Sequence, residues 1–247
     1  MSLFKHVFVV GASSGVGRAL ATELGKAGCT VTLAARDHRD IEAIAQHIRI
    51  AHGVTALTYT LDLETSFNID FSIYDAVFLT AGMSLTRDDA GDQGNKNDLT
   101  EIFQKVMAVN LLGPAKLILS AFSEFKQRSS PTYIGICSTI AAPIPRSKNI
   151  IYAAAKNGLE SIVKSLQYAA TGSPMSIQIF RLGYVDSNLS YGQNLLFPVS
   201  SPEAVAISMI SSAKKSKNRL IYLPNYWRYI VLTIKMLPWS IFTRLRF

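Results

Sequence analysis

The sequence contains little cysteine. Of its 247 residues only two are cysteines, Cys29 and Cys137, and both stand in apolar, strand-like surroundings. So few cysteines exclude a disulfide framework and indicate a reducing compartment, in which we expect two buried thiols. The first residues lead directly into an apolar strand pattern, so we expect no secretory signal peptide and a cytoplasmic location.

Acidic residues are also scarce. Aspartate and glutamate number 17 against 25 lysines and arginines, which gives a net charge of +8. Such a balance suits an anionic ligand, an acidic membrane surface or nucleic acid. The basic residues are spread along the chain without a zinc-finger, basic-zipper or RNA-binding signature, so we expect no nucleic-acid partner. A phosphate-rich cofactor would need only a few of these charges, and we expect no metal site.

Apolar, β-rich runs alternate with helical patterns along most of the chain. Continuous apolar runs such as Val7–Val10 and Ala76–Leu79 indicate strands that are buried on both faces. Because such strands alternate with helices, we expect an α/β fold. It would be a doubly wound parallel sheet of about seven strands with helices on both faces, in a single domain over residues 1–224. The expected strands are 5–10, 30–35, 55–61, 75–80, 132–137, 176–182 and 219–223; the expected helices are 15–27, 38–52, 99–125, 152–170 and 202–215; and the expected long loops are 84–98 and 186–201.

Three closely spaced glycines follow the first expected strand and open the first expected helix. They are Gly11, Gly15 and Gly17. Gly11 permits a tight turn, Gly15 lets the backbone approach a ligand, and Gly17 lets the helix pack closely on the sheet. The helix N-terminus offers free N–H groups and a partial positive charge, which suit a pyrophosphate, and the hydroxyls of Ser13 and Ser14 add donors. A glycine-rich turn without a ligand is the alternative interpretation.

The second expected strand ends in Ala34-Ala35-Arg36-Asp37, where a dinucleotide-binding fold places the residue that reads the ribose. The planar guanidinium of Arg36 suits a 2′-phosphate, so NADP(H) is favoured over NAD(H). Arg18 is a further candidate for this phosphate. We expect Asp37 to cap the following helix rather than to bind the ribose.

A second group of polar residues has the chemistry of proton transfer. Tyr152 and Lys156 are four residues apart on an expected helix, so their side chains are neighbours on one face. A nearby ammonium group lowers the pKa of a phenol, which can then exchange a proton with a carbonyl or alcohol oxygen. Ser138 stands at the carboxyl end of an expected strand, and its hydroxyl can polarise a substrate oxygen there. Asn110 lies in a helical pattern that disfavours asparagine, and a catalytic and a local backbone role both remain open for it.

Over residues 5–223 these motifs occur in the order of the short-chain dehydrogenase/reductase family, which the chain resembles. That family has a Rossmann fold with the glycine pattern Gly-x-x-x-Gly-x-Gly. The matching stretches are Gly11–Gly17, Asp62-Leu63, Thr80-Ala81-Gly82, Val109-Asn110, Ser138, Tyr152–Lys156 and Arg181–Ser187. The resemblance implies cofactor contacts from Gly11, Ser13, Ser14, Gly15, Val16, Gly17, Arg36, Asp62, Leu63, Ala81, Gly82, Asn110, Tyr152, Lys156, Gly183, Val185 and Ser187.

The resemblance also implies a mechanism in which the cofactor carries the hydride and four side chains handle the proton. Tyr152 would protonate the developing alkoxide and Ser138 would hydrogen-bond the same oxygen. Lys156 would lower the pKa of the tyrosine and hold the nicotinamide ribose, and Asn110 would fix a water in a proton relay. The implied protein is an NADP(H)-dependent oxidoreductase for a carbonyl or secondary alcohol compound, assembled as a homodimer or homotetramer through helices 99–125 and 152–170. A nucleotide-binding sensor or scaffold without turnover is the alternative.

The sequence departs from the family pattern at two turns of the expected cofactor site. Thr80 stands where the family usually has asparagine, so we expect a hydroxyl to replace a strand-linking amide contact. Leu182 replaces a common proline before Gly183, in the turn on the nicotinamide side.

Residues 225–247 form an apolar, aromatic and basic tail without acidic residues, which we expect to be helical. Lys235 and Pro238 interrupt it, so it is not expected to span a membrane. Two interpretations remain open. Either the tail packs on its own subunit, on a partner subunit or over the active-site mouth, or it lies on a membrane surface. The apolar composition of the loop 186–201 suits a hydrophobic substrate.

Overall fold

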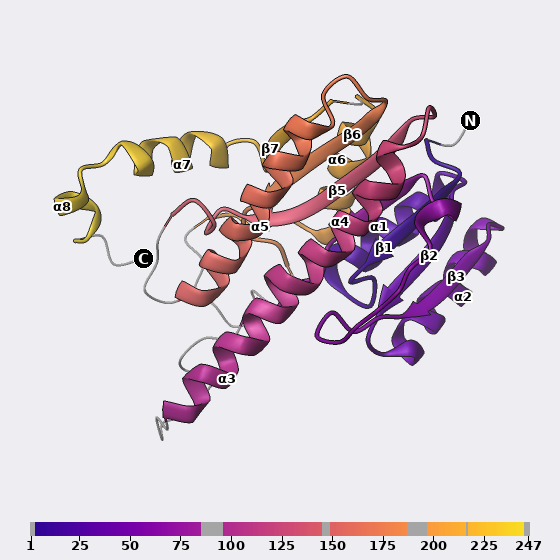
Figure 1. Ribbon diagram of the computed structural model, residues 1–247, viewed down its shortest axis with the longest axis horizontal. Coiled ribbons are helices and arrows are strands. Elements are labelled where there is room, and N and C mark those ends of the chain that lie inside the picture. The colour runs from indigo at the N-terminus through magenta and orange to yellow at the C-terminus, as the bar shows by residue number, and fades with distance from the viewer. Residues whose placement is uncertain (1–2, 85–95, 145–148, 187–196, 216, 245–247) are drawn as a thin grey trace.

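The computed structural model describes residues 3–84, 96–144, 149–186, 197–215 and 217–244 (Figure 1). Its seven strands form one parallel sheet in the order β3-β2-β1-β4-β5-β6-β7. The chain starts in the middle of the sheet, moves outward to β3, returns to β4 beside β1 and continues to the other edge. This is the doubly wound arrangement that the sequence predicts. The strands are β1 (His6–Val10), β2 (Thr30–Ala35), β3 (Ala56–Thr60), β4 (Ala76–Leu79), β5 (Thr132–Thr139), β6 (Met175–Leu182) and β7 (Arg219–Leu223).

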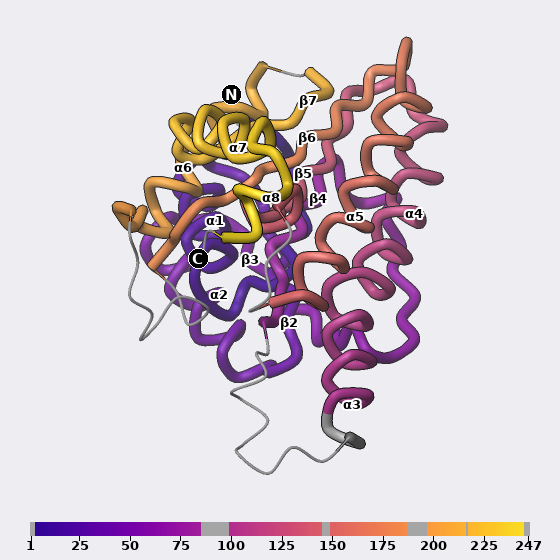
Figure 2. Tube along the Cα trace, turned by 90° about the vertical axis from the view of Figure 1, so that its left-hand side faces the viewer, coloured from indigo at the N-terminus to yellow at the C-terminus, as the bar shows by residue number. Residues whose placement is uncertain are grey.

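Helices cover both faces of the sheet because its central strands are apolar on both faces. Every residue of β4 is buried, as is every residue of β1 except His6. One face carries α1 (Gly15–Lys26), α2 (His38–His52) and α6 (Pro202–Ala213). The other carries α4 (Gly113–Lys126) and α5 (Ile150–Ala169), as the view in Figure 2 shows.

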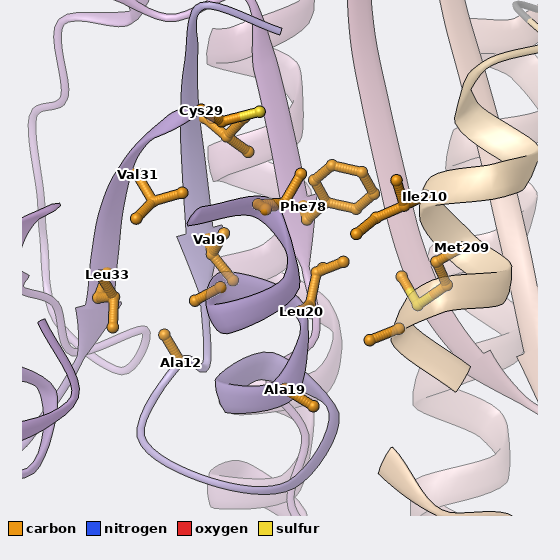
Figure 3. Close-up of a cluster of buried hydrophobic side chains, with 14 of the residues drawn as sticks. Val9, Ala12, Ala19, Leu20, Cys29, Val31, Leu33, Phe78, Met209 and Ile210 are labelled. Carbon is orange, nitrogen blue, oxygen red and sulfur yellow. The ribbon is translucent and has the colours of Figure 1, made fainter. Parts of the chain in front are cut away.

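The core on the α1 side joins distant parts of the sequence (Figure 3). Val9 of β1 and Phe78 of β4 meet Leu20 of α1 and Met209 of α6, and all four side chains are fully buried. Burying one such side chain stabilises a fold by about 1.5–3 kcal/mol. Cys29 belongs to the same cluster, and both cysteines are free and buried, so the sequence prediction of two buried thiols is confirmed.

The helix predicted over 99–125 is not one regular helix. It consists of α3 (Lys96–Met107), a π-helical segment (Ala108–Leu112) and α4. The run Leu99–Lys126 has 28 residues and a mean hydropathy of 1.5, so by length and composition it passes as a membrane span among the described residues. A core helix passes the same test, and 44% of its most apolar window is buried within this fold.

The segment 225–244 is helical, as expected, and contains α7 (Trp227–Met236) and α8 (Trp239–Phe242). Trp227 and Val231 of α7 pack on Ile140 and Ile144, which follow β5. One face of α7 therefore packs on the chain's own fold. Residues 85–95 of the predicted loop 84–98 and residues 187–196 of the predicted loop 186–201 lie outside the described residues, whereas residues 96–98 belong to α3 and not to a loop.

Candidate active site

A cleft of about 490 Å³ opens at the carboxyl ends of the strands, where open α/β sheets bind their ligands. Its walls come from the ends of β1, β2, β4, β5 and β6 and from the first turns of α1 and α5. All of the predicted site residues that the structure describes line it, except Asn110. Ser187 lies outside the described residues.

The glycine-rich turn brings the start of α1 against the sheet. Gly11 has a φ of +83°, and a Cβ atom there would lie 2.6 Å from the backbone nitrogen of Ala81. A Cβ atom at Gly17 would collide with the carbonyl oxygen of Gly11. Ser14 occupies the N-cap of α1 without a side-chain capping bond, and the first turn contains no acidic residue. The partial positive charge of the helix N-terminus therefore faces the cleft uncompensated, as a phosphate site requires.

The far end of the cleft carries Arg36, directly after β2. Its side chain is 58% exposed, and its Nη1 lies 3.5 Å from a carboxylate oxygen of Glu64. Asp62 and Leu63 also line this end. Asp37 accepts a hydrogen bond from the backbone N–H of Arg39 at the N-terminus of α2, so its predicted capping role is confirmed.

Thr80 links the ends of β4 and β1. Its Oγ1 donates to the carbonyl oxygen of Val10 at 2.6 Å. This hydroxyl contact is the one expected from the replacement of asparagine by threonine, and it holds the turn at Ala81 and Gly82 beside the glycine-rich turn.

Asn110 does not line the cleft but supports its wall. The residue is fully buried in the π-helical segment. Its amide group donates to the carbonyl oxygen of Met83 at 2.8 Å and to that of Val106 at 2.9 Å, and it accepts the backbone N–H of Met83 at 3.1 Å. Of the two roles left open by the sequence, the local backbone role is the one that these contacts describe.

Lys156 reaches the cleft from α5 and is 3% exposed. Its Nζ donates to the carbonyl oxygens of Ala81 at 3.2 Å and Cys137 at 3.3 Å, at the ends of β4 and β5. Burial lowers the pKa of Lys156 to about 8, while the nearby thiol of Cys137 and the carboxylate of Glu160 act in the opposite direction.

Tyr152 lies one helical turn before Lys156 and also lines the cleft. Burial raises the pKa of Tyr152 to about 12, and a hydrogen bond with the side chain of Thr139 partly offsets that rise. The sequence predicted a lowered pKa. That prediction is wrong for this structure, because loss of solvent outweighs the favourable contacts and the lysine donates to backbone carbonyls instead.

The hydroxyl of Ser138 is bonded to a buried carboxylate and not free for the predicted contact with a substrate oxygen. It donates to Oε1 of Glu160 at 2.6 Å, and both residues are buried. The next residue of β5, Thr139, bonds to the side chain of Tyr152. The structure therefore places the hydroxyl of Thr139 beside the phenol and bonds that of Ser138 to the carboxylate of Glu160.

Glu160 is the centre of a buried polar cluster that the sequence analysis missed. Besides Ser138, it accepts two hydrogen bonds from the guanidinium of Arg181, at 2.8 and 2.6 Å, and one from Lys164 at 3.3 Å. Burial alone would raise the pKa of Glu160, but the bonds from Arg181 and Ser138 outweigh it and lower the pKa. The cluster joins α5, β5 and β6. Its sequence signal was the four-residue spacing from Lys156, which puts both charges on one face of α5.

The turn after β6 is fixed by α7. The N–H of Gly183 donates to the carbonyl oxygen of Leu223 at 2.9 Å. The indole of Trp227 occupies the position that a Cβ atom at Gly183 would take. Trp227 is 3% exposed, and its ring lies 4.8 Å from that of Phe197, measured between centroids. Gly183 lines the cleft, so the start of the tail lies beside the active site, one of the positions expected from the sequence.

Within the described part of the chain, no group of three or more His, Cys, Asp or Glu side chains is arranged to hold a metal ion.

Comparisons with known proteins agree with this geometry. The sequence model of the family described as short chain dehydrogenase matches residues 5–194. The chain is 28% identical over 171 residues to 3-dehydrosphinganine reductase TSC10B of Arabidopsis thaliana, a match that covers 66% of this chain and 50% of that protein. It therefore spans about half the length of this relative. It is 24% identical to Hydroxysteroid 11-beta-dehydrogenase 1-like protein B of Xenopus laevis, over 90% of this chain and 78% of that protein.

Among solved structures, the fold is similar to a short-chain dehydrogenase from Sphingobium yanoikuyae in complex with NADPH. The TM-score is 0.78 at 18% sequence identity, and the match covers 96% of this chain and 97% of that one.

Proposed function

Because the chain belongs to the short-chain dehydrogenase family, we propose that it is an oxidoreductase that exchanges hydride between NADP(H) and a carbonyl or secondary alcohol compound. One observation carries the proposal. Tyr152, which is hydrogen-bonded to Thr139, and Lys156 line one cleft together with the N-terminus of α1. A proton donor and an anion-binding helix end thus share one cleft.

The residues of the cleft fit a nicotinamide dinucleotide. No side chain could replace the hydrogen atoms of Gly11 and Gly17, so the backbone of this turn is open to close approach by a pyrophosphate. A Cβ atom at Gly82 would lie 3.2 Å from Nζ of Lys156, so a side chain there would crowd the ammonium group. Ser13 and Ser14 add hydroxyl donors beside the helix end. When bound, the cofactor supplies or accepts the hydride.

Arg36 supports a preference for NADP(H). Its guanidinium stands at the end of β2, and the contact with Glu64 is exposed and long, so it would contribute little stability. A 2′-phosphate would offer Arg36 a stronger partner than this carboxylate. The Sphingobium protein, whose fold is similar, binds NADPH.

Tyr152 is the proton donor in the direction of carbonyl reduction. A phenol with a pKa of about 12 is protonated at neutral pH, which is the state needed to protonate an alkoxide. Thr139, rather than Ser138, hydrogen-bonds the substrate oxygen, because its hydroxyl is the one beside the phenol. Lys156 lines the same cleft, and its bonds to the carbonyl oxygens of Ala81 and Cys137 fix it between two strand ends.

The lining of the cleft includes the apolar residues Met83, Ile140, Ala141 and Val185 beside its polar groups. Apolar walls with a few polar groups favour substrates of the same character, so a hydrophobic aldehyde, ketone or alcohol is the substrate class that we propose.

We also infer a homo-oligomer, assembled through α3, α4 and α5. Phe103, Leu112 and Leu119 of the α3–α4 run are each at least 45% exposed, which leaves apolar surface on these helices for a partner subunit. Sedimentation velocity would show a species larger than the monomer, and Leu112→Glu would dissociate it. A monomer at all concentrations would contradict this inference.

The experiment that tests the activity measures oxidation of NADPH by the purified protein with a panel of apolar aldehydes and ketones. We expect turnover with NADPH, less with NADH, and its loss in Tyr152→Phe. NADPH binding by the variant, followed through protein fluorescence, should be unchanged. Binding of NADPH without turnover on any panel member would contradict the proposal and favour a sensor or scaffold.

A further inference from the structure

The helix α7 is apolar on two opposite sides. Its inner side, with Trp227 and Val231, is buried against the fold. On the opposite side, Tyr229, Leu232 and Met236 are 62%, 55% and 76% exposed. Their spacing of three and seven residues places them on one stripe.

In the adjoining α8, Trp239 and Ile241 are 68% and 47% exposed. We call these five residues, Tyr229, Leu232, Met236, Trp239 and Ile241, the outer face. Single exposed apolar residues are ordinary in proteins, but five large ones in two successive short helices, among them a tryptophan, indicate an interaction surface.

The charges around the outer face have one sign. Arg228 and Lys235 are exposed and, being seven residues apart, lie on the same flank of α7. Arg244 follows α8 and is also exposed. No aspartate or glutamate occurs between residues 225 and 247. The partner of this surface must therefore be both apolar and negatively charged.

We propose that the outer face docks on the surface of a bilayer that contains anionic lipids. An amphipathic helix with aromatic and aliphatic residues on one side and basic residues on its flank binds at the level of the lipid headgroups. A two-fold contact between copies would instead place the basic flank of one α7 against that of the other, without an acidic group in either segment. At ten residues, α7 is too short to span the bilayer.

The position of α7 determines where a bound bilayer would lie relative to the cleft. The helix follows β7 at the carboxyl edge of the sheet, where Figure 1 shows it extending away from the body of the molecule. Its inner side packs on Ile140 and Ile144, in the segment directly after Thr139. A bilayer on the outer face would thus lie beside the cleft, within reach of an apolar substrate dissolved in the membrane.

Vesicle flotation of the full chain tests the proposal without an activity assay. We expect binding to vesicles of phosphatidylcholine mixed with phosphatidylglycerol, weaker binding to phosphatidylcholine alone, and a loss of binding at high salt. The double variant Arg228→Gln/Lys235→Gln should bind anionic vesicles about 25-fold more weakly, since each basic residue contributes about fivefold. The matched control is Lys214→Gln/Lys215→Gln, which removes two exposed charges after α6.

A second pair of variants tests the apolar contribution. Trp239→Ser should weaken vesicle binding, whereas Tyr168→Ser, at an 85% exposed position of α5, should not. Circular dichroism of each variant checks that the fold is retained. Equal binding by all four variants would overturn the proposal. The proposal would also be overturned if the intact chain did not bind anionic vesicles but formed an oligomer that Trp239→Ser dissociates, because a second copy would then be the partner.

Discussion

Replacement of Thr139 by valine tests which of two adjacent hydroxyls acts on the substrate. Valine has nearly the shape of threonine and favours the strand conformation, so β5 should keep its geometry. The change removes the hydrogen bond with Tyr152 and the bond in which Thr139 Oγ1 accepts the N–H of Ala141 at 3.2 Å. Loss of one donor to a developing oxyanion lowers kcat by about 100- to 1000-fold. We expect a decrease of this size, with little change in KM for NADPH.

Ser138→Ala is the matched control, because it removes the neighbouring hydroxyl. Glu160 would lose one donor but keep both bonds from Arg181. Leaving a buried acceptor with one partner fewer costs about 1–3 kcal/mol of stability. We therefore expect a lower urea midpoint for this variant, with kcat within about tenfold of the unmodified protein.

The assay for both variants is the steady-state oxidation of NADPH with the best substrate of the panel, alongside urea unfolding. A Ser138→Ala protein that folds normally but loses kcat by about 100-fold, next to an active Thr139→Val protein, would refute the reasoning. That result would assign the catalytic hydroxyl to Ser138.

Three further predictions concern the buried lysine, the ribose end of the cleft and the turn under α7. Burial lowers the pKa of Lys156 from 10.5 to about 8, so below pH 8 the folded protein carries a buried charge that destabilises it. Between pH 8 and 10.5 the folded protein loses this proton while the unfolded chain keeps it, so the stability of the unmodified protein should rise over that interval. The stability advantage of Lys156→Met over the unmodified protein should therefore shrink by about 3 kcal/mol across that interval in urea titrations, and a constant difference would contradict the assigned burial. Arg36→Gln should lower kcat/KM for NADPH by about 10- to 100-fold and leave kcat/KM for NADH nearly unchanged, because the two cofactors differ only in the 2′-phosphate that the guanidinium would bind. Equal losses with NADPH and NADH would contradict this role of Arg36. Gly183→Ala should lower the thermal midpoint of unfolding because its methyl group would overlap the indole of Trp227. In a double-mutant cycle, Trp227→Leu should recover part of that loss. Additive effects of the two substitutions would show that the two residues do not touch.

The fold could be predicted because its signals are local. Each strand is a short apolar run, and a helical pattern long enough for a parallel crossover separates each run from the next, except between β3 and β4. The glycine-rich turn is recognisable from the spacing of its glycines alone, although Gly11 and Gly17 also approach Thr80 and Ala81 at a distant strand end. The elements and this turn could therefore be predicted from patterns within short stretches of the sequence.

The details of the site depend on contacts between distant residues. Ser138 and Thr139 are chemically alike, adjacent and both line the cleft, but the hydroxyl of Ser138 is bonded to Glu160, 22 residues away. The π-helical segment around Asn110 likewise accompanies a bond to Met83, 27 residues earlier. Periodicity within a helix or strand carries no information about such partners.

The α5 helix shows why these distant contacts and the proposed chemistry belong together. Lys156 and Glu160 lie one turn apart on its inner face, the cation toward the cleft and the anion toward β6. The carboxylate favours the charged form of Lys156, and Arg181 in turn neutralises the carboxylate. Without Glu160, burial would lower the pKa of Lys156 further, and the positive charge of Lys156 in the cleft would be lost at a lower pH. A buried ion pair that adds little net stability thus acts to hold a charge at the site of proton transfer.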